Sequence, residues 1–166
     1  MEFTAPEGFK IAAAVAGIKK SGLDLGLLYS DRPATTAVVF TRNAFPAAPI
    51  LVTREHLKAS GNTTRAVLVN AGNANAVTGE AGLNAARQCA AELARQIGCK
   101  PSEVFLSSTG VIGRPLPVEK IVAQVPSLVR TMSPGGADAF HVKMLQLAGE
   151  HAWPEPPVTA DIHASQ

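Results

Sequence analysis

"RAVLVNAGNANAVTGEAGLNAARQCAAELARQI", residues 65–97, is the stretch that decides the fold. Its first part, Arg65 to Asn70, is mainly apolar and predicts a strand that runs into a polar, glycine-bearing loop. From about Ala81 to Ile97, apolar residues recur at steps of three and four, which predicts a helix with one apolar face. That face consists of Leu83, Ala86, Ala90, Leu93 and Ile97. Gly98 then stands where a glycine commonly ends a helix.

Short apolar runs on both sides of this stretch predict further strands. They cover residues 9–16, 25–29, 35–41, 50–52 and 103–106. Turn-forming residues separate several of these runs, including a glycine-rich segment at 17–26 and Asp-Arg-Pro at 31–33. Two more helices are expected: a short one with Thr53 as its N-cap, and one that starts at Pro117 and is broken or kinked at Pro126.

The predicted elements mix strands and helices without strict alternation. The chain has 166 residues, 46% of them hydrophobic and 17% charged, so one domain with a sizeable core can form. We therefore expect an α/β fold, described more closely as an α+β layered sandwich of mixed sheets and helices. Residues 1–136 are expected to form this domain. Residues 137–166 combine poor apolar spacing with a cluster of prolines, which predicts a divergent, weakly ordered tail.

Composition and charge exclude several classes of function. The formal net charge is only +2, and no run of lysine and arginine is interleaved with aromatic residues, so nucleic acid is not an expected partner. No apolar run approaches the roughly 18 residues that cross a membrane. The N-terminus is acidic and interrupted by proline, which is unlike a signal peptide, so we expect a cytoplasmic protein.

The cysteines and histidines do not form a metal or redox motif. Cys89 and Cys99 have neither a zinc spacing nor a Cys-x-x-Cys spacing, and the four histidines are scattered. The sequence also contains no P-loop and no Gly-x-Gly-x-x-Gly motif. No metal or bound cofactor is therefore expected.

The run LSSTGVIGR, residues 106–114, carries the first candidate site. Residues 107–110 (Ser-Ser-Thr-Gly) follow an apolar strand and read as a turn. One interpretation is a hydroxyl-rich bend with no further role. The other is a set of backbone N–H groups that bind an anion, as in an oxyanion hole, where the donors are fixed before the charge develops.

The run NAGNANA, residues 70–76, is the second unusual motif. Asparagine tolerates left-handed backbone and hydrogen-bonds its own neighbours, and glycine permits positive φ. The motif therefore indicates a tightly hydrogen-bonded loop. The residues alone favour a turn held by side chains over a loop that lines a site.

Three long motifs occur in a fixed order, at residues 16–57 (AGIKKSGLDLGLLYSDRPATTAVVFTRNAFPAAPILVTREHL), 65–82 and 103–121. Together they resemble the ornithine acetyltransferase / glutamate N-acetyltransferase family of arginine biosynthesis, over about residues 8–136. The resemblance implies transfer of an acetyl group from N-acetylornithine to glutamate, with acetyl-CoA as a further possible donor. It also implies that the precursor cleaves itself before an internal threonine, which becomes the nucleophile of a β chain. Thr109 and Gly110 match the family's oxyanion-hole residues.

The sequence departs from the family pattern after Gly136. The family's Met-Thr-Thr-Asp segment, its lysine- and glycine-rich stretch and its Ala-Thr cleavage site do not occur, and Thr159 has no cleavage context. We therefore expect an α-chain-like part with a truncated or frame-shifted tail, which is incomplete and inactive without a β-chain-like segment and tends to self-associate. Two alternatives stay open: a non-catalytic binding or regulatory module that docks on a full-length enzyme, and a related self-processing hydrolase.

Overall fold

The computed structural model describes residues 5–136 of the chain as one mixed sheet with helices packed on it. The strands are β1 (Phe9–Ala14), β2 (Leu25–Thr35), β3 (Thr63–Asn73) and β4 (Val104–Val111), in the spatial order β1-β2-β3-β4. The α-helices are α1 (Ala48–Ala59), α2 (Gly79–Ile97) and α3 (Val118–Thr131), and Pro101–Glu103 and Pro134–Gly136 form short 3₁₀ turns. The α/β prediction, in its α+β layered form, is confirmed, whereas the predicted tail at 137–166 lies outside the described residues.

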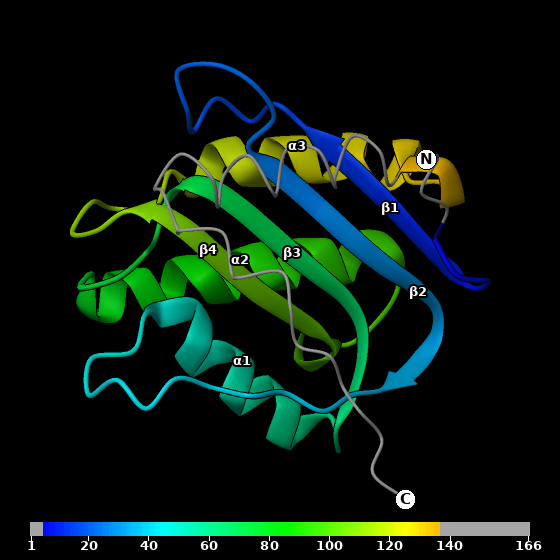
Figure 1. Ribbon diagram of the computed structural model, residues 1–166, viewed down its shortest axis with the longest axis horizontal. Helices are drawn as coiled ribbons and strands as arrows, with labels where there is room; N and C mark the ends of the chain where they lie inside the picture. The colour runs from blue at the N-terminus through cyan, green and yellow to red at the C-terminus, as the bar shows by residue number, and fades with distance from the viewer. Residues whose placement is uncertain (1–4, 137–166) are drawn as a thin grey trace, which may run out of the picture.

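The stretch at 65–97 forms a crossover between two parallel strands. β1 pairs antiparallel with β2, and β2 pairs antiparallel with β3, but β4 lies parallel to β3. After β3 ends, the chain must therefore cross back to the end of the sheet where β3 began before β4 can start. Helix α2 makes that return on one face of the sheet, and α3 packs beside it (Figure 1). Gly98 ends α2 in the left-handed conformation, with φ 71°, as the sequence predicts.

The core lies between the sheet and the helices. Side chains alternate along each strand, so every second residue points toward α2 and α3. The buried residues of this layer are Leu25, Leu27, Ala66, Leu68, Val104 and Leu106 from the strands, with Ala86, Ala90, Leu93, Ile121, Val125 and Leu128 from α2 and α3. Burying each leucine, isoleucine or valine stabilises the fold by roughly 1.5–3 kcal/mol, so this layer holds the helices on the sheet.

The strand predicted at residues 35–41 is wrong. Strand β2 instead continues through Pro33 to Thr35, with an irregular register between Tyr29 and Ala34 that accommodates the proline. Residues 36–47 have no regular structure, and Val39 is 99% exposed. A β-branched run becomes a strand only where a neighbouring strand pairs with it, and the pairing of β2 with β3 ends at Thr35, opposite Thr63.

The strand predicted at residues 50–52 is also wrong, because these residues belong to α1. Pro49 lies in the first turn of this helix, where its missing N–H costs no hydrogen bond. Thr53 is therefore not an N-cap but a buried residue inside α1. Three apolar residues do not distinguish a strand from one turn of helix. Helix α3 likewise continues through Pro126 as one element.

Candidate functional site

The Ser-Ser-Thr-Gly motif lies within strand β4 and not in a turn, which corrects the sequence prediction. The ladder with β3 runs without a break through Val69↔Ser107, Asn70↔Ser108, Ala71↔Thr109 and Gly72↔Gly110 to Asn73↔Val111. The motif stays extended because β3 is itself extended as far as Asn73 and supplies backbone partners. Thr109 and Gly110 are both solvent-exposed near the end of β4. The loop that follows β4 extends to the left in Figure 1.

Gly110 must be glycine because the two backbones approach closely here. Its φ is +132°, which residues with a Cβ rarely adopt. A Cβ at this position would also overlap the backbone of Gly72 and the amide nitrogen of Asn73. Gly110 is therefore required at this position of the ladder, opposite Gly72 and next to the end of β3.

The backbone groups of β4 alternate between β3 and the open edge of the sheet. Ala74 N donates to Val111 O at 3.0 Å, so Val111 and every second residue before it face β3. Leu106 faces the other way, because its N–H and C=O both bond to the Thr53 hydroxyl of α1, at 3.0 and 3.2 Å. By the same alternation the Thr109 amide faces β3 and the Gly110 amide faces the open edge.

Helix α1 covers only the first half of this edge. His56 Nδ1 donates to Val104 O at 2.8 Å, which, with the Thr53 contacts, accounts for the edge groups up to Leu106. No role for His56 is predicted from the sequence, and in the structure it holds α1 against the edge of β4. Beyond Leu106 no described element pairs with the edge, so the Gly110 amide is accessible to a ligand.

The NAGNANA motif forms a network of side-chain hydrogen bonds, as the residues alone favoured. Asn73 Nδ2 donates to Pro115 O at 3.0 Å, and its Oδ1 accepts from Asn75 N at 2.8 Å. Asn75, which is 1% exposed, donates from Nδ2 to Gly82 O at 2.9 Å and accepts from the Thr78 hydroxyl at 2.9 Å. These contacts tie the end of β3 to the start of α2 and to the loop after β4.

Asn70 links the two candidate motifs to one another. The Ser108 hydroxyl donates to Asn70 Oδ1 at 2.6 Å, and Asn70 Nδ2 donates to Asn73 O at 2.8 Å. Asn70 is 5% exposed. Asn70 and Ser108 are 38 residues apart in the sequence, and only the parallel register of β3 and β4 brings them together.

Asp24 has a structural role that the sequence does not predict. Its buried carboxylate accepts from the backbone N–H groups of Ala16, Ile18 and Lys19, at 2.6, 2.6 and 2.9 Å. These bonds fold the glycine-rich segment back so that the Lys19 side chain lies against Gly72. Asp24 directly precedes strand β2 in a glycine-rich segment, and no recognisable sequence motif predicts that its carboxylate binds three backbone N–H groups.

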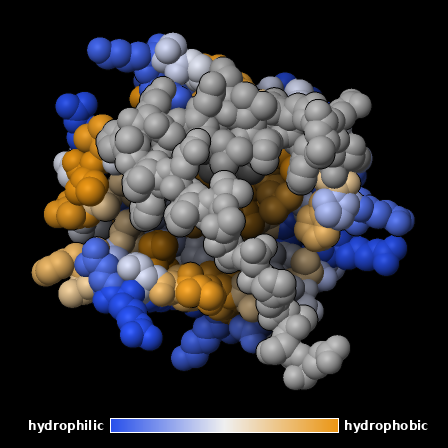
Figure 2. All heavy atoms as spheres, viewed as in Figure 1, coloured by the Kyte–Doolittle hydropathy of each residue, from blue (hydrophilic) through white to orange (hydrophobic). Residues whose placement is uncertain are grey.

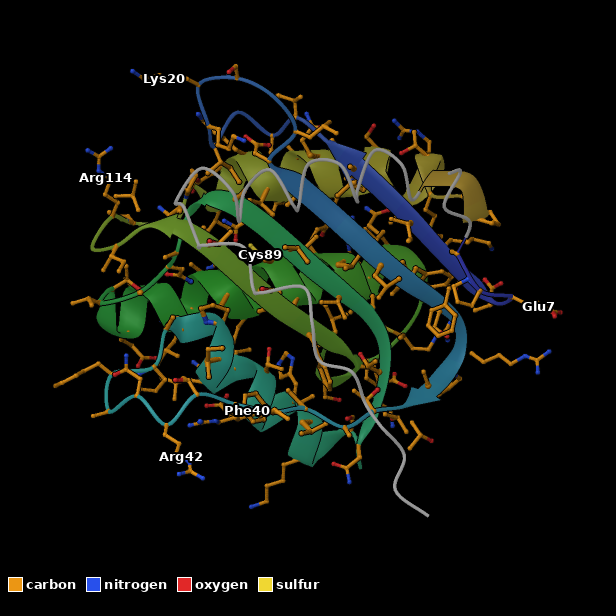
Figure 3. The ribbon with its side chains drawn as sticks, viewed as in Figure 1. Glu7, Lys20, Phe40, Arg42, Cys89 and Arg114 are labelled. Carbon is orange, nitrogen blue, oxygen red and sulfur yellow. The ribbon has the colours of Figure 1, made fainter. Side chains whose placement is uncertain are left out.

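The cysteines are not candidates for nucleophilic chemistry. Burial raises the pKa of Cys89 to about 12, and burial together with the negative charge of Glu103 raises that of Cys99 to about 11. Cys89 is a residue of α2 and is buried in the core that this helix forms with the sheet (Figure 3). Since the thiolate is the reactive form, both are structural residues near neutral pH. Within residues 5–136, no group of His, Cys, Asp and Glu has the arrangement of a metal site.

The loops that follow β3 and β4 lie side by side, joined by Gly113 N donating to Ala76 O at 2.9 Å. Val77 and Ile112 of these loops and Val111, the last residue of β4, are exposed; they are 77%, 65% and 48% accessible. Figure 2 shows apolar atoms gathered at this left-hand end of the molecule. We call these three residues the apolar rim.

None of the described helices is long and apolar enough to cross a membrane.

Comparison with known proteins identifies the family. The model of the ArgJ family matches residues 10–149. The chain belongs to the ArgJ family. The arginine biosynthesis bifunctional protein ArgJ of Chlorobaculum tepidum is 49% identical over 126 residues, which cover 76% of this chain and 31% of that protein. The ArgJ protein of Thermosynechococcus vestitus is 44% identical over 137 residues, covering 82% and 32%. The chain thus spans about a third of the length of these curated ArgJ relatives.

Solved structures of ArgJ proteins share the fold. The arginine biosynthesis bifunctional protein ArgJ of Bacillus halodurans superposes with a TM-score of 0.78 and 35% identity, over 84% of this chain and 73% of that one. The ornithine acetyltransferase of Mycobacterium tuberculosis, solved in complex with ornithine, gives a TM-score of 0.77 and 39% identity, over 84% and 77%. The resemblance read from the sequence motifs is therefore confirmed.

Proposed function

We propose that this chain is the α-chain-like part of an ornithine acetyltransferase / glutamate N-acetyltransferase, which transfers acetyl from N-acetylornithine, or from acetyl-CoA, to glutamate. The observation that carries the proposal is the Gly110 amide, which faces the accessible half of the β4 edge. A rigid N–H donor at an open strand edge suits an oxygen that becomes negative during acyl transfer. Membership of the ArgJ family supports the same chemistry.

Thr109 and Gly110 take different parts in the proposed oxyanion hole. The Thr109 amide belongs to the ladder with β3, so only the amide of Gly110 is free to donate at the edge. Thr109 stays exposed, and its hydroxyl makes no hydrogen bond to any residue in the described range. The hydroxyl and the Gly110 N–H are thus the available donors for the tetrahedral intermediate.

The attacking group comes from a segment outside these residues in the proposed mechanism. A threonine exposed by self-cleavage attacks the acetyl carbonyl, while its own α-amine accepts the hydroxyl proton. The intermediate then expels ornithine, whose nitrogen takes that proton, and leaves an acetyl-enzyme. In the second half of the reaction the α-amine of glutamate attacks this ester, the bond from the acetyl carbon to the threonine oxygen breaks, and that oxygen takes up the proton that the glutamate nitrogen releases. No metal or bound cofactor enters these steps, and the setting we propose is the cytoplasm.

The apolar rim suits contact with the β-chain-like segment. Val77, Val111 and Ile112 lie at the same end of the sheet as Gly110, so a partner seated there would also bring its nucleophile near the Gly110 amide. Exposed apolar clusters of this kind commonly mark interaction surfaces.

The test is an acetyl-transfer assay with and without that segment. The 166-residue chain alone should form no N-acetylglutamate from N-acetylornithine and glutamate, and addition of a β-chain-like segment from a relative should restore transfer. Transfer by the chain alone would contradict the need for a partner. Stable binding to a full-length family member without any gain in transfer would instead support the alternative of a regulatory module.

A further inference from the structure

The pairing of Asn70 with Ser108 stands next to the proposed site without belonging to it. The two residues face each other directly across the β3–β4 ladder, two positions before Gly72 faces Gly110. Their side chains join through a 2.6 Å hydrogen bond from the Ser108 hydroxyl to Asn70 Oδ1. Asn70 is buried and also donates to Asn73 O, so the amide cannot turn without breaking a second bond.

The rest of the ladder near Gly110 offers little side-chain support. Glycine faces glycine at this level, so no side chain packs across the two strands there. Helix α1 holds the edge of β4 only as far as Leu106. An edge strand with one partner and no covering element is the least constrained part of a sheet.

Two asparagine contacts bracket this weakly supported segment. The Asn70–Ser108 bond holds β4 just before Thr109, and Asn73 holds the chain five residues beyond Gly110 by donating to Pro115 O at 3.0 Å. The segment between these contacts carries the Gly110 amide. Its direction therefore depends on buried side-chain hydrogen bonds as well as on the backbone ladder.

We propose that Asn70 and Ser108 are positioning residues that hold the Gly110 amide in a fixed direction. The inference rests on the proposed function, since it gives a rigid Gly110 amide a catalytic purpose. A hydrogen-bond donor stabilises a developing charge most when it needs no reorientation during the reaction. Ser108 contacts no reacting atom and acts only through the strand that carries Gly110.

The neighbouring serine provides a matched control. Ser107 and Ser108 are adjacent on the same strand, but Ser107 is exposed and its hydroxyl makes no hydrogen bond to any residue in the range 5–136. Ser108→Ala removes the bond to Asn70, Ser107→Ala removes a hydroxyl without a bond, and Ser108→Thr retains the donor. All three changes keep the backbone of β4.

The first measurement is the order parameter of the Gly110 amide by ¹⁵N relaxation, on the whole chain without a partner. We expect about 0.85 in the parent protein, in Ser107→Ala and in Ser108→Thr, and a value below about 0.6 in Ser108→Ala. An amide that stays rigid in Ser108→Ala would overturn the proposal. Equal loosening in Ser107→Ala would do the same.

The second measurement is steady-state transfer by the chain combined with the segment that carries the nucleophile. Ser108→Ala should lower kcat about tenfold with KM changed less than twofold, and Ser108→Thr should restore kcat. If kcat stays unchanged in Ser108→Ala although the Gly110 amide has become mobile, the Asn70–Ser108 bond has only a structural role. That result would overturn the proposal that the bond supports catalysis. If the parent complex transfers no acetyl group, the proposed function fails, while the order parameters still decide whether the pair holds Gly110.

Discussion

At the scale of single residues, Gly110 combines a backbone requirement with the oxyanion-hole role that we propose for its amide. Its positive φ and the overlap that a Cβ would make with Gly72 and Asn73 exclude every other residue without rearrangement. The same geometry leaves its amide at the open edge of β4. A glycine that a sequence presents as a turn former is here part of a strand.

Gly110→Ala should therefore damage both stability and transfer. The overlap with β3 should lower the free energy of unfolding by about 2 kcal/mol or more, and displacement of the amide should lower kcat by about 10²–10³. Gly113→Ala is the control, because φ is +77° there too but no atom lies within 4 Å of the added Cβ. That variant should lose only about 1 kcal/mol and keep its activity. Equal losses in urea unfolding for both variants would argue against the close approach of β3.

Cys89 should make the stability of the fold depend on alkaline pH. Its pKa is near 9.0 in the unfolded chain and about 12 when buried, so the folded state holds its proton where the unfolded state releases it. The stabilisation is complete below pH 9 and is lost as the pH rises toward 12, by on the order of 1 kcal/mol per pH unit. Urea unfolding between pH 8 and 10.5 should show a steeper decline in the parent protein than in Cys89→Ala. Parallel pH profiles would show that burial of the thiol does not govern this range.

At the scale of elements, α1 is fixed to the sheet through the edge of β4. The Thr53 hydroxyl satisfies both backbone groups of Leu106, and His56 bonds to Val104 O. Without these contacts, buried N–H and C=O groups would lie unpaired against an apolar helix face. Helix α1 thus acts as a partial cover that ends where the candidate site begins.

Thr53→Val should destabilise the protein by about 2 kcal/mol, because it keeps the shape of the side chain but leaves two backbone groups of Leu106 unpaired. Thr53→Ser retains the hydroxyl and should recover most of that loss. Urea titration followed by circular dichroism measures both. A Thr53→Val variant as stable as the parent would indicate that water replaces the hydroxyl at this edge.

At the scale of the whole molecule, the open half of the β4 edge and the apolar rim lie at one end. An unpaired strand edge next to exposed apolar side chains favours association with another chain. This arrangement accounts for the expectation that the chain self-associates or requires a partner.

Replacement of the rim should reduce that association. We expect the parent chain to form concentration-dependent oligomers in light scattering, and the double variant Val111→Ser, Ile112→Ser to shift toward the monomer. Val39→Ser is the control, because Val39 is 99% exposed but lies in the segment between β2 and α1. A parent chain that stays monomeric at all concentrations would contradict the prediction.

The sequence by itself determined the family, the α/β class and the central unit of strand, asparagine loop and helix. These follow from local signals: the periodicity of residues 81–97, the glycine at its end and long motifs in a fixed order. The strands predicted from the sequence at 35–41 and 50–52 and the turn predicted at 107–110 are wrong. The conformation of a short apolar or glycine-bearing run depends on the elements that pack against it.

Only the tertiary structure decided which groups meet. The parallel register of β3 and β4 places Asn70 opposite Ser108 and Gly72 opposite Gly110, although each pair is separated by the whole of α2. The same register, with α1 on half of the edge, determines that the Gly110 amide is open and that of Thr109 is not. Pairing between distant strands depends on how the layers pack, and no local pattern of residues specifies it.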